Sequence, residues 1–192
     1  MKKINLSPFL FIGACTLSFK LHMDDLADLS VSDVIRRIES QFKIPLGELK
    51  LFDLLVDEER NTAMRHGAYM FFDGRGECIY VGMCSSSHFA HRIGGHFGMS
   101  PKYGMNTFLK RTVKTILGLE DKYPSYVSAL PRMADYRLLL IGTDSKNKGF
   151  IRQLEKLLHI IYRPKLNFPK GFPITYKPVN LGENFALSIA NQ

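Results

Sequence analysis

The sequence predicts an α+β fold with three strands and several amphipathic helices. Two segments, His66–Asp73 and Glu77–Cys84, carry apolar side chains at alternate positions, which is typical of half-buried strands. The glycine-rich turn Gly74–Gly76 joins them, so they are expected to form a hairpin. Tyr136–Ile141 has the composition of a third strand. The alternating positions of the hairpin are Tyr69, Phe71, Ile79 and Val81.

Residues 1–65 are predicted to form a helical N-terminal extension. Leu26–Phe42 begins with acidic residues and continues as an amphipathic helix, with Ser32 as the expected N-cap. Pro45 interrupts the pattern, and helical spacing resumes over Leu46–Glu59, which predicts a second helix. These helices either form a subdomain or cap the core of the domain that follows.

Helical spacing recurs along the rest of the chain. It predicts a helix over His88–Phe97, preceded by three serines that can cap it, and a basic helix over Asn106–Leu117. Gly118–Ala134 contains two prolines and is expected to be irregular. Phe150–Tyr162 has a clear apolar face and predicts a helix, which a proline ends. The tail, residues 169–192, is rich in proline and is expected to be extended.

Composition points to a globular protein of ordinary size. The 192 residues are 45% hydrophobic and 23% charged, and no apolar run reaches the roughly eighteen residues of a membrane span. Three cysteines without a CxxC pair fit free thiols in a reducing, cytoplasmic compartment. One alternative concerns residues 1–15, where two lysines precede a short apolar run that resembles a lipoprotein signal.

Positive charge is concentrated in the second part of the chain. The net charge is +8. Residues 1–65 hold nine basic and ten acidic side chains, whereas residues 66–192 hold seventeen and eight. A local basic excess is what a surface that binds a polyanion needs, so nucleic acid is a candidate partner.

Six polar residues follow one another in an order that suits phosphodiester chemistry. Two lie on the predicted hairpin, two on the helix after it, one on the last helix and one just beyond. Together such side chains can hold a metal, a phosphate and an attacking water. In chain order they are Tyr69, Tyr80, Arg92, His96, Glu155 and Asn167.

These residues and their neighbours resemble the GIY-YIG nuclease domain over residues 66–168. The resemblance implies a small three-stranded antiparallel sheet flanked by helices, and phosphodiester hydrolysis with one divalent metal, Mg²⁺ or Mn²⁺. Ala68 stands where the family usually has isoleucine, which reduces core packing but removes no chemical group. The matching segments are Gly67-Ala68-Tyr69, Tyr80-Val81-Gly82, Arg92-xxx-His96, Glu155 and Pro164-Lys165-Leu166-Asn167.

Each of the ionisable residues of this set, Glu155, Arg92 and His96, has a possible catalytic role, and some also have a purely structural alternative. Glu155 is expected to bind the metal, because one carboxylate with phosphate and waters is a normal Mg²⁺ site; otherwise it is a surface ion-pairing residue. Arg92 can clamp a phosphate. His96 lies four residues later on the same helix face, where it can contact a phosphate oxygen or the water, or simply pack.

The uncharged members are assigned through the resemblance. Tyr69 is the candidate general base, although a phenol of pKa about 10 is a poor base unless its surroundings favour the phenolate. Tyr80 is expected to bind the phosphate or the attacking water. Both are otherwise core tyrosines with satisfied hydroxyls. Asn167 either contacts the scissile region or braces a loop.

The segments outside the motifs most resemble the restriction endonucleases of this family. We expect a sequence-specific enzyme on double-stranded DNA, with a homodimer matching a two-fold site. The alternatives are a structure-specific repair or mobile-element nuclease and a non-catalytic nucleic-acid-binding protein. The basic insertion, residues 100–134, is expected to contact DNA. Its candidate residues are Tyr103, Asn106, Lys110, Arg111 and Lys114.

Overall fold

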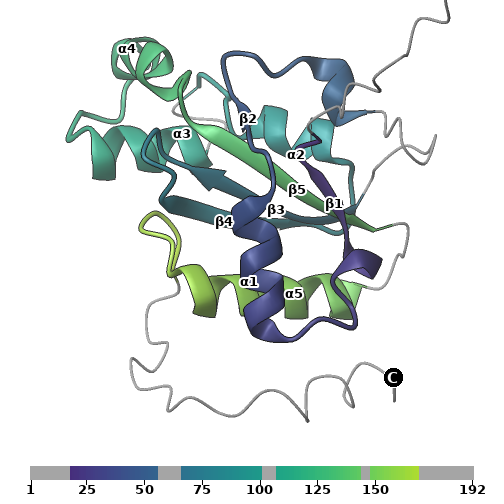
Figure 1. The fold of residues 1–192 in the computed structure, drawn as a ribbon. Coiled ribbons are helices and arrows are strands. Elements are labelled where there is room, and N and C mark those ends of the chain that lie inside the picture. Colours follow the sequence, from purple (N-terminus) through teal and green to yellow (C-terminus); the bar gives the residue numbers. More distant parts are fainter. Residues whose placement is uncertain (1–17, 56–65, 101–106, 144–147, 169–192) are drawn as a thin grey trace, which may run out of the picture.

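The computed structural model describes residues 18–55, 66–100, 107–143 and 148–168, and its fold is α+β, with one sheet and helices on both of its faces (Figure 1). All three predicted strands are present. Among them, β3 lies between β4 and β5 and runs antiparallel to both. Their bounds are His66–Phe72 for β3, Cys78–Cys84 for β4 and Arg137–Thr143 for β5.

Within the described residues the sheet has five strands and is mixed, so the predicted three-stranded antiparallel sheet is only part of it. β1 (Lys20–His22) pairs with β5 in parallel, and β2 (Ile44–Pro45) pairs with β5 in antiparallel orientation. The order is β1-β5-β3-β4, which leaves β4 at one edge. Strands of two or three residues are too short to produce a recognisable alternation, which explains why the sequence did not predict them.

Asp73 closes the turn of the central hairpin. Its carboxylate Oδ1 accepts hydrogen bonds from the backbone N–H groups of Arg75 and Glu77, each at 3.0 Å. Gly76 has φ of +86°, in the left-handed region that favours glycine. The predicted turn is therefore confirmed, and its two interactions with Asp73 fix where β4 begins.

One face of the sheet is covered by α1 (Val31–Ser40) and α5 (Lys148–Tyr162), as Figure 1 shows. Both were predicted as amphipathic helices. The N-cap of α1 is Ser30, whose side chain accepts from the Asp33 backbone N–H, rather than the predicted Ser32. The core of this face includes Val34, Ile38, Ala68, Met70, Val81, Leu139, Ile151, Leu154 and Leu158.

The other face carries Tyr69, Phe71 and Tyr80, and we call it the tyrosine face. Helices cover it as well, and three of them supply core residues (Figure 1). The predicted helix over His88–Phe97 is confirmed. The predicted basic helix is a short α-helix continued by a π-helical turn. These elements are α2 (Phe89–Gly95), α3 (Thr107–Arg111), the π-turn η3 (Thr112–Ile116) and α4 (Tyr123–Met133).

The prediction that Gly118–Ala134 is irregular is wrong, because α4 occupies most of it. Pro124 stands in the first turn, where a backbone N–H has no partner inside the helix. Pro131 lies inside the last part of the helix, where it removes one hydrogen bond to the preceding turn. Three apolar residues, Tyr126, Ala129 and Met133, bury the helix against the tyrosine face. Tertiary packing therefore outweighs the cost of the second proline.

The predicted helix over Leu46–Glu59 is also wrong within the described residues. Only a 3₁₀ turn, η2 (Leu51–Leu54), forms there, and Leu54 is its one buried residue. A second 3₁₀ turn, η1 (Met23–Asp25), follows β1. Among the described residues, no helix is both long and apolar enough to cross a membrane.

Candidate active site

The two motif tyrosines lie together because of the register between β3 and β4. Tyr69 is opposite Gly82 and Tyr80 is opposite Phe71, so both side chains project from the same face. Their rings stack with centroids 6.2 Å apart and planes 16° apart. Tyr69 is fully buried, and Tyr80 is 5% exposed.

A β-bulge in β4 lies directly next to Tyr80. Phe71 pairs with Tyr80 but Phe72 pairs with Cys78, so Ile79 is an extra residue in the ladder. Ile79 and Tyr80 consequently both pack on the tyrosine face, whereas Val81 packs on the other face. The predicted alternation, which put Ile79 and Val81 on one face, is wrong for this reason.

Gly67 and Gly82, the glycines of the two motif tripeptides, lie where no side chain can be accommodated. A Cβ atom on Gly82 would overlap the hydroxyl and ring of Tyr69, which crosses directly over this residue. A Cβ atom on Gly67 would overlap the backbone carbonyl of Ile141 on β5, and Gly67 also has φ of +143°. Any side chain at either position would therefore displace a strand or the tyrosine.

The end of α2 brings two further residues to the Tyr69 hydroxyl. His96, the C-cap of α2, has its Nε2 atom 2.6 Å from the Tyr69 oxygen. Arg92, one turn earlier, donates from Nε to the same oxygen at 3.2 Å. Four of the six predicted site residues therefore form one cluster, which we call the tyrosine cluster: Tyr69, Tyr80, Arg92 and His96.

The hydrogen bonds of His96 fix the direction of this network. The Nδ1 atom of His96 accepts from the backbone N–H of Phe108 at 3.3 Å. A neutral imidazole has one donor and one acceptor nitrogen, so we assign its proton to Nε2, which then donates to Tyr69. The Tyr69 oxygen thus accepts two N–H bonds, one from His96 and one from Arg92. Its own O–H must therefore point to another group, and the interaction with Tyr80 raises the pKa of Tyr69.

Burial dominates the protonation of the cluster. Burial, with smaller contributions from Arg92 and Arg111, lowers the pKa of His96 to about 3. Burial also raises the pKa of Tyr69 well above its usual value, and Arg92 opposes part of this shift. The pKa of Tyr80 is likewise raised by burial, against Arg111 and Arg92. Both phenols and the imidazole are therefore neutral at pH 7.

Glu155 acts on the cluster from α5. Burial of its half-buried carboxyl group raises the pKa, and the positive charges of Arg92 and Arg152 lower it. The Glu155 charge in turn raises the pKa of Tyr80. These interactions are electrostatic, and they couple the charge of Glu155 to Tyr80 and Arg92.

The fit of the site to a metal depends on its carboxylate and on the charges around it. Among the described residues, no three or more His, Cys, Asp or Glu side chains gather into a metal-binding group. Mg²⁺ does not need such a group, because it keeps several waters and takes oxygens from substrate phosphates. Burial disfavours the negative charge of Glu155, so a nearby cation would stabilise it. The lone carboxylate therefore fits Mg²⁺ or Mn²⁺.

Asn167 braces the edge of the sheet. Its Oδ1 atom accepts from the Val81 backbone N–H at 3.1 Å, and its Nδ2 atom donates to the Val81 carbonyl. The Leu166 backbone N–H donates to the Ile79 carbonyl at 3.0 Å. Of the two roles expected for Asn167, the structure therefore has the bracing one.

The five predicted DNA-contact residues lie in different surroundings. Tyr103 and Asn106 lie outside the described residues. Lys110 forms an ion pair with Asp121, and Lys114 is exposed on η3.

Arg111, the remaining predicted DNA contact, is bound to the loop after α5 and acts electrostatically on the tyrosine cluster. Its Nη1 atom donates to the Leu166 carbonyl at 3.0 Å, and its charge lowers the pKa of Tyr80 and His96. Sequence spacing assigned Arg111 only to a basic helix face. No local signal connects a helix near residue 110 with a loop near residue 166.

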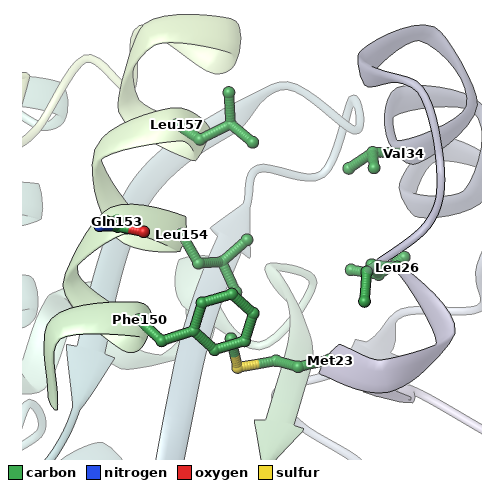
Figure 2. Close-up of a pocket in the computed structure, with 8 residues that line it drawn as sticks. Met23, Leu26, Val34, Phe150, Gln153, Leu154 and Leu157 are labelled. Atoms are coloured by element: carbon green, nitrogen blue, oxygen red, sulfur yellow. The ribbon is translucent and has the colours of Figure 1, made fainter. Parts of the chain in front are cut away.

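Two hollows lie elsewhere in the molecule. Figure 2 shows a cavity of about 30 Å³ between α5 and the segment from η1 to α1, where Phe150, Leu154 and Leu157 face Met23 and Leu26. A larger apolar hollow, of about 310 Å³, lies among η2, α2 and α4. Neither is lined by a residue of the tyrosine cluster.

Comparisons with protein-family models, with curated proteins and with solved structures find no match for this chain.

Proposed function

We propose that this chain is a metal-dependent DNA endonuclease of the GIY-YIG type that hydrolyses phosphodiester bonds. The observation that carries the proposal is the contact of Tyr69 with His96 and Arg92 beside Tyr80. These residues come from two strands and a helix, and Glu155 acts on them from a second helix. A phenol pair, an arginine and one carboxylate supply what phosphodiester hydrolysis requires.

Arg92 is the phosphate-binding residue of the proposal. The bond to Tyr69 uses one of the five N–H donors of its guanidinium group, so the forked end can still bind two phosphate oxygens. Its attraction grows as negative charge builds up on those oxygens in the transition state. Arg92 should therefore contribute more to kcat than to substrate binding.

The tyrosines position the attacking water. Tyr80 is the more exposed of the two and contacts the water or the phosphate, and Tyr69 is the candidate base behind it. The raised pKa of Tyr69 keeps the phenol protonated at neutral pH unless further positive charge approaches. Two N–H donors on its oxygen already favour the phenolate.

His96 and Asn167 act as positioning residues. Both ring nitrogens of His96 bond within the protein, so it orients Tyr69 instead of touching substrate. Asn167 fixes the backbone next to Tyr80. Glu155 would hold Mg²⁺ or Mn²⁺, which supplies positive charge that activates a water and neutralises the phosphate.

The proposed substrate is double-stranded DNA, cut at a specific sequence as by a restriction enzyme, with a homodimer on the two-fold site. The basic excess of residues 66–192 and the exposed Lys114 support nucleic acid as the partner. A cytoplasmic location fits this role and the sparse cysteines.

Plasmid cleavage by the purified chain tests the proposal. With Mg²⁺ we expect discrete fragments, and with EDTA none. Glu155→Gln should lower the cleavage rate by at least about a hundredfold and leave DNA binding nearly unchanged, because it removes one metal ligand. Glu39→Gln is the matched control, since it makes the same change at an exposed position of α1.

Other outcomes would correct specific parts of the proposal. Cutting confined to branched or damaged DNA would replace the restriction assignment with a repair or mobile-element nuclease. DNA binding without any cleavage would contradict the enzymatic assignment. Full activity of Glu155→Gln would show that the metal ligand is wrong.

A further inference from the structure

The N-terminal turn of α3 is attached directly to the tyrosine cluster. The backbone N–H of Phe108 donates to His96 Nδ1 at 3.3 Å, and that of Leu109 donates to the His96 carbonyl at 3.2 Å. The Phe108 ring also lies against Tyr80, with centroids 5.5 Å apart. Because Arg111 is only three residues beyond Phe108, its backbone is held beside the cluster.

The side chain of Arg111 is anchored at a second point. Its Nη1 atom donates to the Leu166 carbonyl at 3.0 Å. The backbone N–H of Leu166 donates to the Ile79 carbonyl. The next residue, Asn167, forms hydrogen bonds with both backbone groups of Val81. The guanidinium group is therefore tied to the strand segment that carries Tyr80.

The helix changes its geometry immediately after Arg111. The π-turn η3 begins at Thr112, and its wider hydrogen bond runs from the Leu117 N–H to the Thr112 carbonyl at 3.0 Å. Isolated π-turns are rare and occur frequently at functional sites. Arg111 is thus the last residue of regular helix before this turn.

The charges around the cluster suit an anion. Among the described residues, Arg92 and Arg111 form no ion pair within 4.0 Å. Each uses one N–H donor on a protein oxygen, which leaves the rest of both guanidinium groups available. Two arginines without ion pairs beside neutral phenols can bind phosphate oxygens, and the Glu155 carboxylate is the negative charge that acts on the same cluster.

We infer that Arg111 is a second phosphate-binding arginine, which forms with Arg92 a two-arginine clamp on the scissile phosphate. This inference rests on the proposed function and deepens it. A phosphodiester carries one negative charge, and the charge on its oxygens rises towards about two as the attacking water gives its proton to a base and its oxygen adds to phosphorus, before the P–O bond to the leaving oxygen breaks. A second arginine therefore contributes chiefly in the transition state.

Two measurements on the full chain test this inference. Calorimetric titration with thymidine 3′,5′-bisphosphate without metal reports phosphate binding, and plasmid cleavage reports catalysis. Arg111→Gln should weaken bisphosphate binding about tenfold or more and lower kcat more than it raises KM. Arg111→Lys keeps the charge but not the fork, and should fall between wild type and Arg111→Gln. Arg36→Gln, an exposed arginine on α1, is the control and should match wild type.

The outcomes separate this inference from the proposed function. Bisphosphate binding that depends on Arg111 in a chain that cuts no DNA upholds the phosphate site and contradicts the nuclease. Cleavage and bisphosphate binding by Arg111→Gln at wild-type levels overturn the role of Arg111 and leave the nuclease standing. An equal loss in Arg36→Gln would also overturn the role, because the effect would be one of net charge. If Arg111→Gln melts at a lower temperature than wild type, its losses could come from instability, and Arg111→Lys decides. Bisphosphate binding and kcat at wild-type levels in Arg111→Lys would contradict two-pronged binding of phosphate by the guanidinium group.

Discussion

The proton on His96 determines how the buried polar groups of this site are oriented. With Nδ1 occupied by the Phe108 N–H, Nε2 must donate to Tyr69, and Tyr69 must direct its own proton elsewhere. A protonated His96 would carry two donors and would lose the bond from Phe108. The imidazole is 1% exposed, so water could not compensate for that loss.

The low pKa of His96 predicts that the fold loses stability in acid. An unfolded histidine has a pKa of about 6.5, whereas folded His96 has a pKa of about 3. The unfolded chain therefore binds the proton first, so this stabilisation is complete above pH 6.5 and is lost as the pH falls towards 3. Each pH unit in that range costs about 1.4 kcal/mol.

Urea unfolding at pH 7.5 and pH 4.5 measures this effect. His96→Gln cannot be protonated and should show a weaker dependence on pH than wild type. His91→Gln, at an exposed position of α2, should keep the wild-type dependence. The same dependence in wild type and His96→Gln would assign the acid sensitivity to other groups.

At the scale of elements, the segment after α5 completes the exposed edge of the sheet. Among the residues that the structure describes, β4 has a strand on one side only, and Leu166 and Asn167 occupy the other side. Asn167 pairs with both backbone groups of Val81, as a neighbouring strand would. The loop thereby fixes the strand that carries Tyr80.

Asn167→Ala should destabilise the protein by about 1–3 kcal/mol, because it leaves a backbone N–H and a carbonyl of Val81 without partners. Urea unfolding measures the loss, and faster amide hydrogen exchange at Val81 locates it. Asn167→Asp should lose less, since it still accepts from the N–H. Gln153→Ala, at an exposed position of α5, is the control; a loss of the same size there would contradict the assignment.

Strands and helices could be predicted from the sequence where the alternation of a strand or the spacing of a helix continues over about seven residues or more. The seven-residue strands β3 to β5 and the fifteen-residue helix α5 meet that condition. β1 and β2 do not, because they are short and pair with the distant strand β5, and the bulge at Ile79 interrupts the alternation by one residue. α4 was missed because two prolines outweighed its apolar face. In the site, helix spacing predicted the pairing of Arg92 with His96, whereas the contact of Arg111 with Leu166 depends on tertiary structure.

At the scale of the whole molecule, the N-terminal segment is built into the sheet. β1 and β2 both pair with β5, so the segment contributes strands as well as a helix. Its apolar residues complete the core on the face opposite the tyrosine cluster. They are Leu21, Met23, Leu26, Val34 and Ile38.

A chain beginning at residue 66 should therefore not fold cooperatively. It would expose one side of β5 and remove seven of the described buried apolar residues, namely these five together with Phe19 and Leu54 on the tyrosine face, each worth roughly 1.5–3 kcal/mol. Circular dichroism during heating, compared with the full chain, measures the loss. A sharp transition in the shortened chain would identify residues 66–192 as an independent domain.

The space that Gly82 leaves for the Tyr69 ring bears on how distant relatives could be recognised. The glycines and tyrosines of the two tripeptides are constrained by contacts on the tyrosine face or with β5. The middle residues, Ala68 and Val81, only pack against the opposite core and can change together with it. A search pattern should therefore keep the outer letters of both motifs fixed and leave the middle letters free.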